Sequence, residues 1–121
     1  MSAISVTGSA TTAVSGNFSI YRGEDVTVTD TMSPATNITG WSLAFTVRKN
    51  YGDPNPALIA KTVGAGITIT NATNGVFTIA IARADTASLT PGVYVYDVQR
   101  TDAGNETVLT IGYLTILPEV F

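Results

Sequence analysis

The sequence lacks several of the residues from which proteins build reactive sites. Its 121 residues include no cysteine and no histidine. This absence excludes disulfide frameworks, zinc sites made of cysteine and histidine, thiol nucleophiles and every catalytic triad with an imidazole base. Charged residues are also scarce, at 12% of the chain, against roughly 25% in an average soluble protein. The net charge of −3 argues against a nucleic-acid-binding protein, which would show a basic patch.

Long apolar runs are missing as well. No run approaches the ~20 apolar residues that cross a bilayer, and residues 1–10 lack the basic and apolar regions of a signal peptide. We therefore expect no membrane partner. The absence of cysteine agrees with folding in a reducing cytoplasm, and the length fits one domain of ordinary size.

What the chain has in abundance is threonine. It contains 20 threonines and 8 serines, and 45% of its residues are hydrophobic. Threonine is β-branched and favours strands, and apolar residues alternate with polar ones along much of the chain. The clearest alternation runs from Trp41 to Val47, so we expect the only tryptophan at the centre of the core. Turn signals such as Asn74-Gly75 separate these segments about every 8–12 residues.

These patterns predict an all-β fold with seven or eight short strands. The only segment with helical character covers residues 83–90, which is too short for the crossover helix that parallel strands need. We therefore expect an immunoglobulin-like antiparallel β-sandwich with one short helical corner, and a barrel of similar strand count as the alternative. Asp85 and Tyr94 resemble the corner residues of immunoglobulin-like domains, although their spacing is longer and the paired cysteines are absent.

Residues 1–16 form a separate zone of composition, ahead of a sandwich domain over residues 17–121. The zone has no charged residue, and it cannot bury enough surface to fold alone. Two interpretations are open at this point. The zone is either a flexible chain end or an extended N-terminal arm that docks on a neighbouring molecule.

Two segments break the rule that a sandwich strand has one apolar and one polar face. Residues 107–117 are apolar on both faces, with Gly112 as the expected bulge that switches the faces, and residues 93–98 carry valines opposite tyrosines. Either a neighbouring loop covers the second face, or that face meets a partner. The predicted interface consists of Ile4, Val6, Val14, Val93, Val95, Val108, Leu114, Ile116 and Phe121.

No group of residues points to a catalytic or metal site. Glu24 and Asp25 are adjacent, and neighbours in a strand point to opposite faces. Asp102, Asn105 and Glu106 share a predicted turn, but a calcium site needs about six to eight oxygen ligands. We therefore predict that the protein is not an enzyme and has no cofactor and no metal site.

Several short segments resemble a family of small phage virion proteins. This family is similar in pattern to the N-terminal domain of the phage baseplate upper proteins. The segments that carry the resemblance, all within residues 17–118, are Phe18–Asp25, Ile38–Leu43, Ile67–Gly75, Leu89–Asp97 and Leu114–Pro118. The resemblance implies an immunoglobulin-like module that serves assembly and not catalysis. Baseplate upper proteins continue into a long trimeric fibre region, whereas this sequence stops at Phe121, which favours a stand-alone virion module.

From these observations we expect a non-enzymatic structural protein of the phage virion, and above all a capsid decoration (cement) protein that stabilises the shell. A tail or baseplate protein, or a head–tail adaptor, is the first alternative. A carbohydrate- or receptor-binding sandwich that uses Tyr21, Tyr51 or Trp41 as a stacking platform is the second. The expected partners are the major capsid protein or other virion proteins and further copies of the chain, with no nucleic acid and no membrane. The expected location is the virion, assembled in the host cytoplasm.

Overall fold

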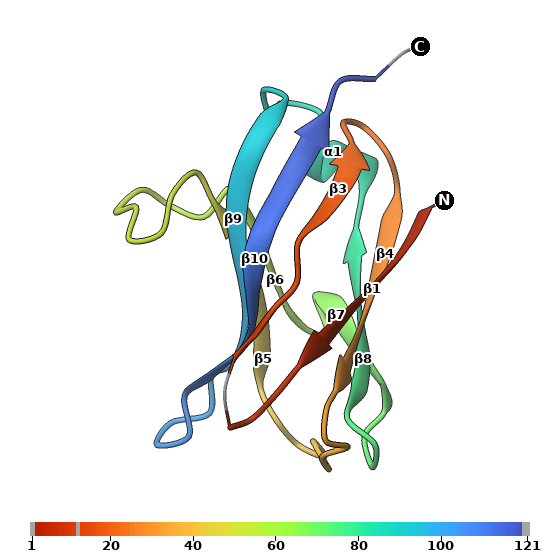
Figure 1. Ribbon diagram of the computed structural model, residues 1–121, viewed down its shortest axis with the longest axis vertical. Coiled ribbons are helices and arrows are strands. Elements are labelled where there is room, and N and C mark those ends of the chain that lie inside the picture. The colour runs from red at the N-terminus through yellow and green to blue at the C-terminus, as the bar shows by residue number, and fades with distance from the viewer. Residues whose placement is uncertain (1, 12, 120–121) are drawn as a thin grey trace.

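The structure is a computed structural model, and it describes residues 2–11 and 13–119. Within these residues the chain consists mostly of strands, with one helix of a single turn (Figure 1). The elements are, in chain order, β1 (Ser2–Gly8), β2 (Val14–Ser15), β3 (Phe18–Tyr21), β4 (Val26–Met32), β5 (Leu43–Arg48), β6 (Ile59–Val63), β7 (Gly66–Asn71), β8 (Val76–Ile81), α1 (Arg83–Thr86), β9 (Gly92–Arg100) and β10 (Thr107–Leu117).

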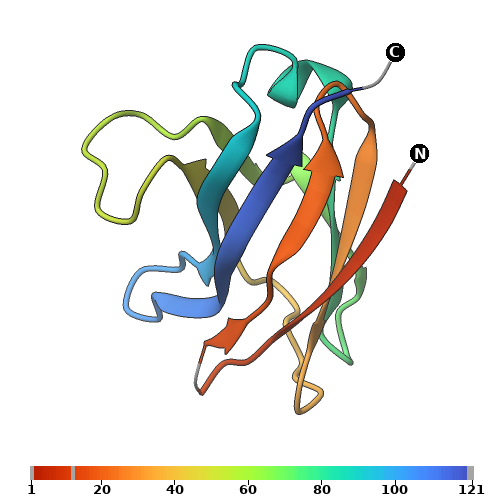
Figure 2. The same ribbon diagram turned by 45° about the horizontal axis from the view of Figure 1, so that its top comes forward.

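The strands form one mixed sheet that is almost closed into a barrel. The order of the strands is β1-β4-β8-β7-β6-β5-β9-β10-β2, and β3 pairs with β10 next to β2. The two ends of this sheet meet where β1 reaches β10 (Figure 2). There the Ser9 N–H donates to the Leu109 carbonyl at 3.0 Å, and the Thr110 hydroxyl lies 3.2 Å from the Thr7 carbonyl.

This architecture differs from the predicted antiparallel sandwich. The described strands form one sheet and not two, so the barrel alternative describes them better. Four pairings are parallel, those of β1 with β4, β2 with β10, β3 with β10 and β6 with β7. The prediction assumed that parallel neighbours need a crossover helix. Between β1 and β4, however, the chain passes through β2 and β3, which lie on β10, so other strands make the connection.

The segment 1–16, predicted as an arm, contributes two strands to this sheet. β1 pairs with β4 along its whole length, from Ser2↔Val26 to Gly8↔Met32, and β2 pairs with β10. Val6 is 9% exposed and belongs to the core, and Ile4 packs against the core from the same strand. The described part of the segment therefore docks on its own chain.

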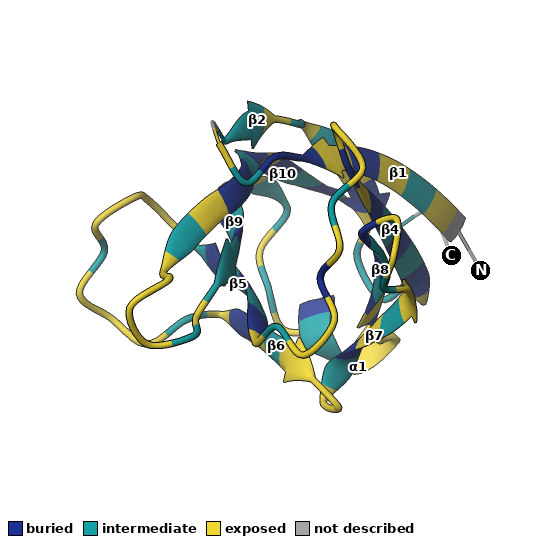
Figure 3. Cartoon of the chain, turned by 90° about the horizontal axis from the view of Figure 1, so that it is seen from below, coloured by how far each residue is buried: buried dark blue, intermediate teal, exposed yellow. Residues whose placement is uncertain are grey.

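The core lies inside the barrel, and buried residues recur along the strands that enclose it (Figure 3). Phe45, Phe77 and Tyr96 are its largest fully buried side chains. The ring centroid of Tyr96 lies 5.1 Å from that of Phe18 and 5.7 Å from that of Phe45. These aromatic contacts join β3, β5 and β9 across the interior, and such pairs contribute about 0.5–1.5 kcal/mol beyond the area that they bury.

Trp41 does not occupy the centre of this core, so the prediction for it is wrong. β5 begins at Leu43, and Trp41 precedes it in an irregular segment. Its ring is partly buried against the edge of the core, and the guanidinium of Arg100 lies 4.1 Å from the ring centroid. The alternation of apolar and polar residues therefore extends back to Trp41, although pairing with the neighbouring strand β9 begins only at Leu43.

The two apolar faces of β10 are explained by a bulge, although not at Gly112. The register of β10 against β9 shifts between Val108 and Thr110. Leu109, at the shift, points into the core, and after the shift Thr110 and Leu114 do so. Gly112 is needed for a different reason, because a Cβ there would lie 2.4 Å from the carbonyl oxygen of Gly16.

The helical corner is shorter than predicted. α1 covers Arg83–Thr86, half of the segment 83–90. Asp85 fixes its start, because its Oδ2 accepts the Ala82 N–H at 2.7 Å and lies 2.8 Å from Nζ of Lys61. Asp85 thus anchors the corner to β6.

Tyr94 of β9 bonds to the segment between the corner and β9, and it does not contact Asp85 through a hydrogen bond. Its hydroxyl donates to the Thr90 carbonyl at 2.5 Å. This bond to the backbone a few residues upstream is the contact that defines the tyrosine corner of immunoglobulin-like domains. Tyr94 thus makes a contact of this kind, with the backbone of Thr90 as the acceptor.

Candidate functional site

The outward face of β9 and β10 carries exposed apolar side chains. In β9 the side chains of Tyr94, Tyr96 and Val98 are buried in the core, so the residues between them point outward. We call this surface the β9–β10 face, and it consists of Val93, Val95, Asp97, Ile111, Tyr113 and Thr115. Val93 is 54% exposed and Tyr113 is 53% exposed. Exposed apolar groups that lie together on one face are typical of interaction surfaces.

A loop covers part of the β9–β10 face. Residues 49–58, between β5 and β6, project from the barrel beside β9 (Figure 1). The Tyr51 hydroxyl donates to the Gly112 carbonyl at 3.0 Å and accepts the N–H of the same residue at 3.2 Å, which fixes the loop to the middle of β10. Val95 is only 7% exposed, whereas the Tyr51 residue itself is 54% exposed. The loop therefore covers one part of the second face, around Val95, and the other part remains open to a partner.

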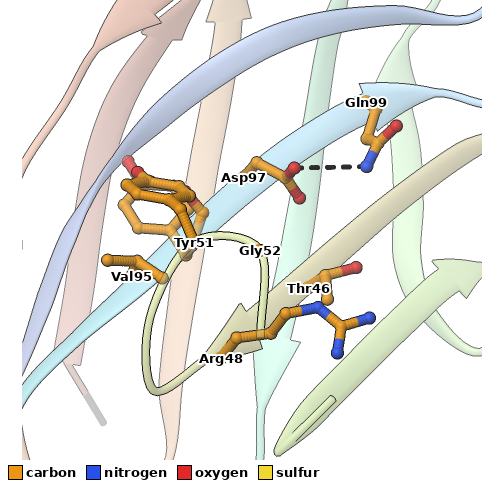
Figure 4. Close-up of a pocket in the computed structure, with 8 residues that line it drawn as sticks. Thr46, Arg48, Tyr51, Gly52, Val95, Asp97 and Gln99 are labelled. Carbon is orange, nitrogen blue, oxygen red and sulfur yellow. Dashed lines mark hydrogen bonds between the residues drawn. The ribbon is translucent and has the colours of Figure 1, made fainter. Parts of the chain in front are cut away.

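A pocket of about 150 Å³ lies between this loop and the sheet (Figure 4). β5 and β9 form its floor, and the loop forms one wall. The guanidinium of Arg48 donates a hydrogen bond to the Asn55 carbonyl and so links β5 to the loop. The lining residues are Thr46, Arg48, Tyr51, Gly52, Val95, Tyr96, Asp97 and Gln99.

Asp97 in this pocket has a carboxylate oxygen without a hydrogen-bond partner within the described part of the chain. Its Oδ2 accepts a hydrogen bond from Nε2 of Gln99 at 3.2 Å. Its Oδ1 is buried and has no hydrogen-bond partner among the described residues. Burial raises the pKa of Asp97, and the Gln99 hydrogen bond and the charge of Arg48 oppose this rise. A carboxylate in this position favours a ligand that donates hydrogen bonds.

The structure distributes the nine predicted interface residues over the interior and the surface. Val93 and Val108 are exposed, and Ile4 and Val14 are partly buried. The residues that are buried within their own chain, and so offer no surface to a partner, are Val6, Val95, Leu114 and Ile116. Phe121 lies outside the described residues. The exposed valines thus remain the predicted contacts that a partner could reach.

Sequence reasoning missed the centre of the site. Asp97 is a charged residue that interrupts the apolar run from Val93 to Val98, and this was the signal that could have found it. The link between Tyr51 and Gly112 had no signal, because 61 positions separate the two residues. Of the three predicted stacking residues, only Tyr51 lines this pocket.

The acidic residues considered for chemistry accept hydrogen bonds from the protein itself. Asp25 accepts the Arg83 N–H at 2.9 Å. Asp102 accepts from Arg100 at 2.7 Å and from the Ser42 N–H at 3.0 Å, and Glu106 accepts the Gly104 N–H at 3.0 Å. Among the residues that the structure describes, no three acidic side chains gather where they could hold a metal ion.

The helix content bears on one further point. Over the described ranges, 2–11 and 13–119, none of the helical structure is both long and apolar enough to span a membrane.

Comparisons with known proteins place the fold but not a family. No family model matches the chain, and no curated protein matches it in sequence. Among solved structures, the fold is similar to the N-terminal domain of phage TP901-1 ORF48, with a TM-score of 0.63 and 11% sequence identity. The similarity covers 98% of this chain and 100% of that domain. The nearly closed, mixed barrel of this chain is thus a fold that a phage protein also uses.

Proposed function

We propose that the chain is a non-enzymatic structural protein of a phage virion and acts as an adaptor in the tail or baseplate. The fold similarity to ORF48, a baseplate protein of its phage, supports this proposal over nearly the full length of the chain. The segments that resemble small phage virion proteins, a family similar in pattern to the N-terminal domain of baseplate upper proteins, agree with this proposal. Capsid decoration, the first expectation from the sequence, has no corresponding support from the fold similarity.

The adaptor function rests on the β9–β10 face as the contact surface. Val93, Tyr113 and Tyr51 are each more than half exposed and lie on or beside two paired strands. Burying the exposed part of each of these side chains contributes roughly 1 kcal/mol, about half of the value for complete burial. The partners under this proposal are other virion proteins or further copies of the chain.

Electron microscopy of virions with a gold-labelled antibody against the chain tests the proposal. Virions are purified from a culture that expresses the gene. Label at the tail tip is the expected result, label over the head would favour decoration, and unlabelled particles would reject both virion functions. A glycan array screened with the purified protein covers the receptor-binding alternative.

A variant of the β9–β10 face tests whether this surface makes the contact. Tyr113→Ser removes an exposed ring from the face, and Tyr21→Ser removes a similarly exposed ring, 45% exposed, from the end of β3. We expect the first variant to be depleted from virions and the second to be incorporated normally. Equal incorporation of both would place the contact elsewhere.

A further inference from the structure

The unpaired oxygen of Asp97 carries an inference about the partner. Oδ1 is buried without a hydrogen-bond partner, yet the pocket that Asp97 lines is open to solvent on one side. Charges buried in proteins are normally paired, and an unsatisfied buried group in a native structure requires an explanation. A binding group that enters through the open side would meet the carboxylate of Asp97.

Arg48, the basic residue that lines this pocket, does not form a hydrogen bond with Oδ1 of Asp97. Arg48 lines the same pocket, but its guanidinium bonds to the carbonyl of Asn55 in the loop wall. The ion pairs of the described residues are Arg22–Glu119, Lys61–Asp85 and Arg100–Asp102. Asp97 belongs to none of them.

We propose that this pocket receives a cationic side chain, arginine or lysine, from a partner protein in the virion. The proposal deepens the adaptor function and rests on it. The carboxylate of Asp97 supplies the charge at the base of the pocket, and the Tyr51 ring supplies an aromatic wall for the cation. The Gln99 amide and the Thr46 hydroxyl line the pocket and add hydrogen-bonding capacity beside the carboxylate.

The size of the pocket favours one side chain over a free ligand. Its volume of about 150 Å³ is below the roughly 300–1,000 Å³ of pockets for small molecules. The surroundings match a protein interface, in which a charged anchor enters a small pocket and a ring of apolar contacts excludes water. Val93 and Tyr113 on the β9–β10 face provide exposed apolar contacts of this kind.

Three short peptides test the proposal on the full chain by NMR. The probes are acetyl-Gly-Arg-Gly-amide, the same peptide with lysine, and the same peptide with citrulline, the uncharged isostere of arginine. At pH 7.5 and low salt, the arginine or the lysine peptide should shift the amide signals of Tyr51, Asp97 and Gln99 saturably. The citrulline peptide should bind at least about tenfold more weakly, because hydrogen bonds to charged groups are the stronger ones.

Two charge-matched variants locate the effect. Asp97→Asn should weaken the binding of the cationic peptides at least about tenfold, whereas Asp25→Asn removes a carboxylate outside the pocket and should leave it unchanged. Should Asp97→Asn fail to fold, the wild-type chain provides a second measure. Binding should decline on acidification as Asp97 takes up a proton.

Several outcomes would overturn the proposal. These are equal binding of the citrulline peptide, unchanged binding to Asp97→Asn, or no shift with any peptide. Any of them, combined with gold label at the tail tip, would reject the cationic anchor and leave the adaptor function standing.

Discussion

A buried carboxylate at the closure of the barrel makes stability depend on pH. Asp30 of β4 is fully buried, and its Oδ2 lies 2.9 Å from the hydroxyl of Thr110 on β10. That hydroxyl has one hydrogen, and the Thr7 carbonyl of β1 competes for it at 3.2 Å. When Asp30 is protonated it can donate to Thr110, and Thr110 can donate to Thr7. Protonation thus completes a chain of bonds that joins β4, β10 and β1.

The magnitude follows from the pKa of this carboxyl. Burial raises the pKa of Asp30 from 3.8 to about 6, and the hydrogen bond from Thr110 opposes the rise. Burial raises the pKa of Tyr96 on β9, and the charge of Asp30 in turn raises it further. The folded state holds a proton between about pH 4 and pH 6 that the unfolded chain has released. Stability therefore falls as pH rises through this window, by about 1.4 kcal/mol per pH unit and about 3 kcal/mol in all.

Asp30→Asn removes this dependence, since the amide is neutral at every pH. We expect the variant to match the wild type near pH 4 and to exceed its free energy of unfolding by about 3 kcal/mol above pH 7. Urea unfolding followed by the fluorescence of Trp41, from pH 4 to pH 8, measures the difference. Asp102 and Glu119, whose pKa values are lowered by Arg100 and Arg22, respond oppositely but equally in both proteins. A difference that stays constant with pH would refute the reasoning.

Three further substitutions test the packing. Gly112→Ala should lower the free energy of unfolding by about 2 kcal/mol, because its Cβ would meet the Gly16 backbone; an unchanged urea midpoint would contradict the close approach. Tyr51→Phe should cost about 1 kcal/mol and speed hydrogen exchange of the Gly112 amide, which loses its acceptor; unaltered exchange would show that the loop is held otherwise. Phe45→Ala should cost about 3–5 kcal/mol by calorimetry, since the ring is fully buried, and a loss below 1 kcal/mol would place it outside the core.

The strands could be predicted from the sequence because their signal is local. Alternation marked β5 and β8 nearly at their observed bounds, but it marked only the first part of β4, because the sequence predicts a loop over residues 30–39 and the strand continues to Met32. The buried residues of all three strands follow the alternation strictly. The number of sheets could not be predicted in the same way, because pairing across the barrel depends on contacts between distant segments. β1 is the clearest case: its residues gave no sign that they would pair in parallel with Val26–Met32.

The face of a strand could be predicted only where the register is regular. In β10 the shift between Val108 and Thr110 exchanges the two faces. Leu114, predicted at the interface, therefore lies in the core, whereas Tyr113 is exposed. A bulge moves the ladder by one residue, and a single residue is enough to turn every following side chain to the other face.

Two groups can be distinguished among the few charged residues of this chain, those that form ion pairs and those that are buried without a partner for one oxygen. Of the three ion pairs of the described residues, Arg22–Glu119 joins the turn after β3 to the segment after β10, Lys61–Asp85 joins β6 to the corner, and Arg100–Asp102 is local. All of these side chains keep some exposure. Asp30 and Asp97 are different, because each has a buried oxygen without a partner. Sequences break local rules mostly at functional or strained sites, and access to solvent distinguishes the two cases. Asp30 is fully buried where the barrel closes, so it can only gain or lose a proton. Asp97 lines a pocket that is open to solvent, so a group of a partner protein can bind to it.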